Sequence, residues 1–236
     1  MQQAKDDTIH KFENDRWQFD ENVAHVFNDM LARSIPGIYD MRQLCASTAA
    51  MYTSAHSLLD IGASNGGSLV PMLERWPGIQ VTAVEPSAAF CEQLRENFPG
   101  IELIHGYAQD LVVPSSTYDI VQAVLTMMFI PTEHRHRIYD MVYRALTPGG
   151  VFIIVDKILG RDSRHDTGLT NQYYSFKYNQ GGYSWEQIAT KARSLEGVQI
   201  CLTEQATEAM LEDNGLRPQK FWQYGKFAAW ICTKQA

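Results

Sequence analysis

Two carboxylates, each at the end of an apolar run, are the side chains best placed to do chemistry. The first run ends in Asp60 and leads into the glycine-rich loop Gly62-Ala-Ser-Asn-Gly66, and the second run, Val81–Val84, ends in Glu85. A strand, a glycine turn, a helix and a second strand with a terminal acid form the nucleotide-binding half of a doubly wound α/β fold. The sequence therefore predicts a nucleotide site between this loop and Glu85.

The spacing within the loop argues against a dinucleotide. A pyrophosphate site needs G-x-G-x-x-G, whereas Ser64 stands between Gly62 and Gly66 here. Asp60 would repel a pyrophosphate but suits the ammonium group of an amino acid, and Glu85 can accept both hydroxyls of a ribose. A ribose with a cationic tail describes S-adenosylmethionine, which is the predicted cofactor. The plainer alternative is that Asp60 caps the next helix and the glycines only make a turn.

Composition limits the remaining classes. With 236 residues, 45% of them hydrophobic, the chain can bury one substantial core. A net charge of −7 argues against a general grip on nucleic acid, which leaves only a local basic cluster such as Arg135–Arg137. The four cysteines form no C-x-x-C pair, so we expect buried free thiols in a reducing compartment. No apolar run approaches a membrane span and the polar start does not resemble a signal peptide, so a cytoplasmic protein without a membrane partner is expected.

The elements that must position the site alternate between strand and helix. Polar residues 1–18 predict a partly mobile tail, and apolar periodicity predicts helices from about 20 to 35 and from 40 to 53. We expect residues 1–54 to form a tail and a helical cap over the strand ends, and residues 55–236 to form the main domain. Strands are expected at 57–60, 79–84, 101–104, 120–124 and 151–155. Helices are expected at 68–75 and 88–97, and a third helix, with Ile138 and Met141 on its apolar face, is expected to stop at Thr147–Gly150. This order predicts a mostly parallel sheet with right-handed crossovers.

The alternation ends after residue 155. An aromatic-rich helical insertion is expected at about 161–200, with Ser184-x-x-Gln187 as a capping box. A helix over 203–213 and two strands, 220–224 and 227–233, follow. Gly225-Lys226 between those strands predicts an antiparallel hairpin.

Four motifs, taken together, resemble the class I S-adenosylmethionine-dependent methyltransferases. They are Asp60-x-Gly62, Glu85, Tyr118-Asp119 and Leu146-x-Pro148-Gly149-Gly150. The likeness implies an α/β, Rossmann-like sheet, mostly parallel with an antiparallel C-terminal hairpin strand, with helices on both faces and an N-terminal helical cap. It also implies methyl transfer from a sulfonium, an in-line displacement in which a catalytic base is optional. No catalytic residue is therefore assigned, and no metal is predicted.

A closer resemblance covers nearly the whole chain. The segment from Phe19 to Gly37 looks like the N-terminal signature of the carboxy-S-adenosylmethionine synthases. The glycine loop of this chain, with Ser64 in it, is also similar to the loop of that family. Further matches are Asp156-Lys157, Phe176-Lys177, Tyr183-Ser184 and Leu195-Glu196-x-Val198. That family makes a carboxylated sulfonium from S-adenosylmethionine and prephenate, which later modifies a wobble uridine in tRNA. The resemblance implies a small-molecule substrate and a homodimer.

The departures from this family fall in the pocket. Tyr107 stands where the family has an Asp, with Asp110 three residues further on, and Val124 stands for its fourth-strand Asn. The arginine that grips the added carboxylate aligns with Ala192, although Arg193 follows. The cofactor contacts implied are Tyr39, Asp60, Gly62, Ala63, Ser64, Gly66, Glu85, Pro86, Tyr107, Ala108 and Val124. Arg193, Lys157 and Tyr183 are the candidates for contacts to a substrate or a carboxylate.

Three interpretations of function remain open from the sequence. The first is an S-adenosylmethionine-dependent methyltransferase acting on an unidentified acceptor. The second is a carboxy-S-adenosylmethionine synthase, or a user of its product in nucleic-acid modification, with a rearranged anion site. The third is a ligand-binding homologue that has lost catalysis, for which Tyr107 and Val124 would be symptoms.

Overall fold

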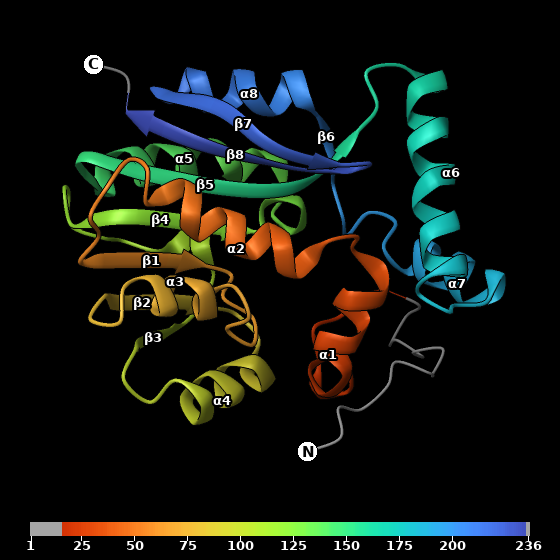
Figure 1. Ribbon diagram of the computed structural model, residues 1–236, viewed down its shortest axis with the longest axis horizontal. Coiled ribbons are helices and arrows are strands. Elements are labelled where there is room, and N and C mark those ends of the chain that lie inside the picture. The colour runs from red at the N-terminus through yellow and green to blue at the C-terminus, as the bar shows by residue number, and fades with distance from the viewer. Residues whose placement is uncertain (1–15, 235–236) are drawn as a thin grey trace.

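The computed structural model describes residues 16–234, whose centre is one eight-stranded sheet (Figure 1). The strand order is β3-β2-β1-β4-β5-β8-β7, and β6 pairs with β5 off this path. Strands β1 to β5 run parallel, whereas β8 is antiparallel to both β5 and β7. The strands are β1 (Ser57–Ile61), β2 (Gln80–Glu85), β3 (Glu102–His105), β4 (Tyr118–Val124), β5 (Leu146–Leu159), β6 (Leu202–Thr203), β7 (Leu216–Tyr224) and β8 (Phe227–Lys234). The predicted fold class, with its antiparallel C-terminal hairpin, is confirmed.

Helices cover both faces of the sheet. They are α1 (Glu21–Ser34), α2 (Ile38–Ala49), α3 (Leu69–Arg75), α4 (Ala88–Asn97), α5 (Thr132–Ala145), α6 (Ser163–Asn179), α7 (Trp185–Ser194) and α8 (Glu204–Asp213), with short 3-10 turns η2 (Ala108–Asp110) and η3 (Met127–Phe129). Alternate residues of β5 enter different cores: Val151 and Ile153 pack with α2 and α3, and Phe152 and Ile154 pack with α5 and α8. Burial on both faces explains why this strand is almost entirely apolar.

Only one of the two N-terminal helices acts as the predicted cap. Helix α1 lies beyond the carboxyl ends of the strands, but α2 packs along a face of the sheet, with Met41 and Cys45 in the same core as Leu58 and Ile153 (Figure 1). Its apolar stripe is buried against residues of the strands, which holds α2 on this face of the sheet. The predicted tail was set too long, because Trp17 is buried and packs near α1. The rest of that tail, residues 1–15, lies outside the described residues.

Two strands begin earlier than their sequence patterns indicate. The Thr147–Gly150 segment, expected as a helix stop, already belongs to β5, because Leu146 pairs with Tyr118 across a register irregularity. Strand β7 begins at Leu216 and contains Pro218, which a strand at the edge of a sheet tolerates. In both places the strand partner overrides residues that break strands locally.

The insertion after β5 is helical, as expected, and α6 and α7 lie at one side of the carboxyl ends of the strands (Figure 1). The predicted capping box of α7 is present: the backbone N–H of Ser184 donates to Gln187 Oε1 at 2.8 Å, and that of Gln187 donates to Ser184 Oγ at 3.2 Å. All four cysteines are free, three of them buried and Cys201 half-buried. Within residues 16–234 we found no helix with the length and apolarity needed to cross a membrane.

Candidate cofactor site

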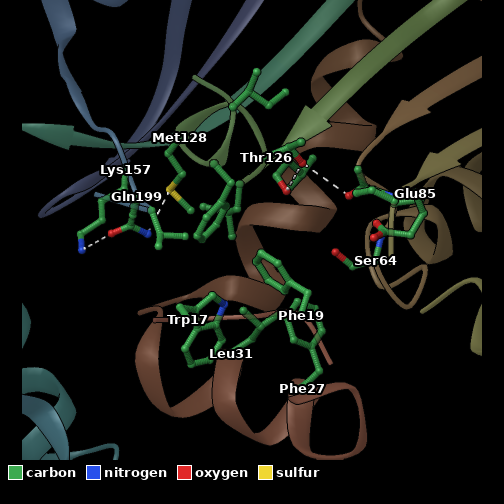
Figure 2. Close-up of a pocket in the computed structure, with 18 of the residues that line it drawn as sticks. Trp17, Phe19, Phe27, Leu31, Ser64, Glu85, Thr126, Met128, Lys157 and Gln199 are labelled. Carbon is green, nitrogen blue, oxygen red and sulfur yellow. Dashed lines mark hydrogen bonds between the residues drawn. The ribbon is translucent and has the colours of Figure 1, made fainter. Parts of the chain in front are cut away.

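A cavity of about 580 Å³ lies where the carboxyl ends of β1, β2, β4 and β5 meet helix α1 and the turn η3. Its volume is within the usual range for small-molecule sites, roughly 300–1,000 Å³. The cavity has two ends of different character, with Ser64 and Glu85 at one and Lys157, Gln199 and Met128 at the other (Figure 2). Apolar residues of α1, among them Phe27 and Leu31, line the space between the two ends.

The glycine loop is shaped by its backbone. Gly62 and Gly66 have φ of +73° and +80°, a region that favours glycine. A side chain on Gly62 would collide with Thr126, and one on Gly66 would collide with Phe98. Ser64 also has a positive φ, +51°, in the region that favours glycine. The loop is therefore held against Thr126 and Phe98. The N–H groups of Gly62 and Ala63 donate to the carbonyl of Val84, which ties the loop to the end of β2.

Glu85 holds the loop in place as well as facing the cavity. Its Oε2 accepts from the backbone N–H of Ser64 at 2.8 Å, and its Oε1 accepts from that of Ser87 at 2.9 Å. Burial raises the pKa of Glu85, and the two amide donors oppose that rise. Because a carboxylate offers about four lone-pair sites, two stay available for ribose hydroxyls. The geometry is compatible with the predicted ribose contact.

Asp60 lies outside the lining of this cavity. The side chain is only 1% exposed, and burial raises its pKa to about 7, which a hydrogen bond with Gln122 partly opposes. Its Oδ2 has no hydrogen-bonding partner in the part of the chain that the structure describes. The contact with a ligand ammonium expected for Asp60 stays a prediction.

Sequence reasoning missed Arg42 on α2, which lines the cavity next to Gly67 of the glycine loop. The side chain is 9% exposed, and its Nε is buried without a partner among residues 16–234. Burial lowers the pKa of Arg42, and attraction from Tyr39 and Asp60 opposes that effect. Arg42 shares the buried face of α2 with Ile38 and Cys45. A charged residue inside that apolar stripe was the signal available in the sequence.

The opposite end of the cavity holds two lysines. Lys157 Nζ donates to Gln199 Oε1 at 2.9 Å and lies 4.7 Å from the ring centroid of Tyr173, and desolvation lowers its pKa. Gln199 in turn approaches Met128 Sδ at 3.5 Å. Lys191 of α7 reaches the cavity too, with Nζ 4.3 Å from the ring centroid of Trp17.

Several predicted site residues lie elsewhere. Arg193 is exposed and absent from the lining, because two residues along a helix turn the side chain roughly 200° away from that of Lys191. Tyr183 is buried beneath the Arg33 guanidinium, 4.1 Å from its ring centroid, and Tyr39 is 57% exposed. The predicted residues that do line the cavity are Gly62, Ala63, Ser64, Glu85, Pro86, Tyr107, Ala108, Val124 and Lys157.

Two residues that the sequence comparison singled out, Tyr107 and Asp110, differ in their relation to the cavity. Tyr107 is 61% exposed at the rim, and Asp110, which could have replaced the family's Asp, does not line the cavity. Residues 16–234 contain no group of three or more His, Cys, Asp or Glu side chains arranged to hold a metal ion. The cavity itself presents the carboxylate of Glu85 and the cations Arg42, Lys157 and Lys191.

The sheet order and the loop together define a class I methyltransferase fold. Residues 58–150 match the family model described as a methyltransferase domain. Among solved structures, human N-acetylserotonin methyltransferase in complex with SAM aligns with a TM-score of 0.63 and 14% identity, over 92% of this chain and 57% of that one. The YcgJ protein from Bacillus subtilis aligns with a TM-score of 0.59 and 18% identity, over 79% and 72% of the two chains.

Relatives of similar length narrow the class to a family. The carboxy-S-adenosyl-L-methionine synthase of Campylobacter lari is 31% identical over 98% of this chain and 100% of its own length. The synthase of the same name from Shewanella piezotolerans is 28% identical over 92% and 93% of the two chains. The chain belongs to the carboxy-S-adenosyl-L-methionine synthase family.

Proposed function

We propose that the protein binds S-adenosylmethionine in this cavity and transfers its methyl group to a small acceptor. The ribose would lie at Glu85 and the glycine loop, and the sulfonium would point toward the apolar stretch near α1. Methyl transfer needs alignment of the acceptor and exclusion of water rather than a positioned base. A cavity with polar groups at both ends and a mostly apolar passage between them (Figure 2) supports that chemistry.

One observation favours methyl transfer over carboxy-S-adenosylmethionine synthesis. It concerns the end of the cavity at Lys157, opposite Glu85, which we call the far end. Ala192 replaces the arginine that the family resemblance assigns to the added carboxylate, and the neighbouring Arg193 is outside the lining. The far end therefore presents lysines, which lack the bidentate fork of a guanidinium. We assign Lys157 to an anionic group of the acceptor.

Carboxy-S-adenosylmethionine synthesis is the second candidate. Family membership over nearly the full length supports it, and so do the two cations Lys157 and Lys191 at the far end. In that reaction one of these lysines would hold the new carboxylate, and prephenate would be the second substrate that the resemblance implies. The third interpretation, a binding protein without catalysis, has no observation in its favour beyond the replacements at Tyr107 and Val124.

Mass spectrometry of the ligand that copurifies with the protein separates these candidates. Methyl transfer predicts S-adenosylmethionine or its demethylated product. A nucleoside heavier by one carboxyl group, formed from S-adenosylmethionine only when prephenate is supplied, would establish the synthase instead. Binding of S-adenosylmethionine without turnover on any acceptor would favour the binding protein.

The family resemblance also supports a homodimer, a cytoplasmic location and a link to tRNA modification, which we include in the proposal. Light scattering of the purified protein tests the homodimer. The link to tRNA is supported by the resemblance alone, because the net charge is −7 and Arg135 of the Arg135–Arg137 cluster is buried.

A further inference from the structure

We propose that Arg42 binds the α-carboxylate of the ligand and so makes this end of the cavity selective for an intact amino-acid moiety. This inference rests on the proposed function, because it takes S-adenosylmethionine as the ligand. It assigns a role to a residue that neither the sequence motifs nor the family resemblance single out. Its basis is the state of the Arg42 guanidinium.

Arg42 is a buried cation without a counter-ion in contact. It is 9% exposed, and among the residues described it makes neither a hydrogen bond nor an ion pair. A guanidinium carries five N–H donors and stays charged. Leaving such a group buried and unpaired is unfavourable unless an anion completes the site. Arg42 is among the residues that line the cavity.

Asp60 does not satisfy this cation. The two side chains attract each other, but no salt bridge joins them, and Asp60 Oδ2 is itself without a partner in the described chain. Ser34 of α1 lines the same cavity, and its buried hydroxyl is likewise unpartnered within residues 16–234. A carboxylate of the ligand would accept hydrogen bonds from the Arg42 guanidinium and the Ser34 hydroxyl. Both buried donors would then have a partner.

The position of Arg42 relative to the loop fits the carboxylate end of the ligand. A Cβ on Gly67 would lie 2.6 Å from Arg42 Nη1 and 2.8 Å from its Cζ, so the guanidinium packs directly on this glycine. Ser64, which binds Glu85, is three residues away along the chain. Three residues span at most about 10 Å, which the chain from the ribose to the carboxylate can cover. The loop thus joins a ribose site to an anion site.

Calorimetry with three nucleosides tests the assignment. S-Adenosylmethionine carries the carboxylate, decarboxylated S-adenosylmethionine keeps only the ammonium, and 5′-methylthioadenosine lacks the amino acid. Wild type should bind the first about tenfold or more tighter than the second, as expected for a charged hydrogen-bonded pair. In Arg42→Met this preference should disappear, while the affinity for 5′-methylthioadenosine stays unchanged.

A second variant keeps the test valid if Arg42→Met does not fold. Gly67→Ala keeps the arginine but pushes its guanidinium aside, and should abolish the same preference. Arg75→Met, on an exposed arginine of α3, is the matched control and should leave the preference intact.

A preference that survives at wild-type strength in both Arg42→Met and Gly67→Ala would overturn the assignment. Equal loss of affinity for all three nucleosides would also overturn it, because Arg42 would then support the fold only. If wild type binds S-adenosylmethionine without preferring it over the decarboxylated form, the Arg42 inference alone fails. If wild type binds none of the three, the proposed function fails as well.

Discussion

Asp60 is a carboxylate that the fold buries so completely that its ionisation costs stability. Its pKa is raised from the ordinary 3.8 to about 7 by burial. A group whose pKa is raised on folding contributes stability below its unfolded pKa, and this contribution is lost as the pH rises through the folded pKa. The structure therefore predicts a ligand-free protein that loses stability between about pH 4 and pH 7 at this residue.

The variant Asp60→Asn isolates that effect, because asparagine resembles the protonated acid and does not titrate. At about pH 3, below both the unfolded and the folded pKa of Asp60, its melting temperature should match that of wild type. Near pH 8 the variant should melt higher by several degrees, since about 1 kcal/mol corresponds to roughly 2–4 °C in a chain of this size. Thermal melts across this range measure the gap, and two parallel curves would contradict the assigned pKa. The pKa of Asp156 is also raised to about 7. Because Asp156 titrates in both proteins, its effect does not contribute to the difference between their melting temperatures.

Glu85 acts on the loop and on the ligand through the same two oxygens. In Glu85→Gln one oxygen becomes an NH2 group that faces a backbone N–H of Ser64 or Ser87, so one of these hydrogen bonds is lost. We expect a loss of about 1–3 kcal/mol in stability and at least about tenfold weaker binding of 5′-methylthioadenosine. Because this probe lacks the amino acid, Arg42→Met is the matched control and should leave its affinity unchanged. Undiminished binding by Glu85→Gln would remove Glu85 from the ribose site.

At the scale of elements, α7 carries Lys191 to the cavity and depends on its capping box to begin at Trp185. Ser184→Ala removes the acceptor of the Gln187 N–H and should cost about 1 kcal/mol, or roughly 2–4 °C in melting temperature. Ser163→Ala is a suitable control, because the N-cap of α6 is Asp162 and not Ser163. Equal effects of the two substitutions would mean that the capping box does not stabilise α7.

The elements also show where sequence reasoning succeeds and where it stops. The capping box and the helix from Ala88 to Asn97 depend on nearby residues, so the sequence predicts them. The placement of α2 depends on distant partners, and so does the early start of β5. The site divides in the same way: the loop and Glu85 follow from local spacing, whereas Arg42 and Lys191 reach the cavity only through packing. The sequence points to Arg193 as the neighbour of the aligned Ala192 and does not single out Lys191, which lines the cavity in the structure.

At the scale of the whole molecule, Arg135 joins two walls of the cavity that lie far apart in the sequence. Its Nε donates to the carbonyl of Ile130 at 2.8 Å, and its Nη2 donates to that of Ile200 at 2.6 Å. Ile130 lines the cavity just after η3, and Ile200 follows Gln199, which holds Lys157. The Arg135 side chain is 1% exposed, and its charge opposes the burial-driven rise in the pKa of Asp156.

Arg135→Met should therefore destabilise the fold and open the cavity together. It leaves the carbonyls of Ile130 and Ile200 without this donor, and each buried polar group left unsatisfied costs about 1–3 kcal/mol. The melting temperature should fall by roughly 10 °C, and S-adenosylmethionine binding should weaken because the Ile130 and Ile200 segments separate. Arg137→Met, two residues away but exposed on the same helix, should change stability by no more than about 0.5 kcal/mol. Comparable melting of the two variants would show that these segments hold together without Arg135.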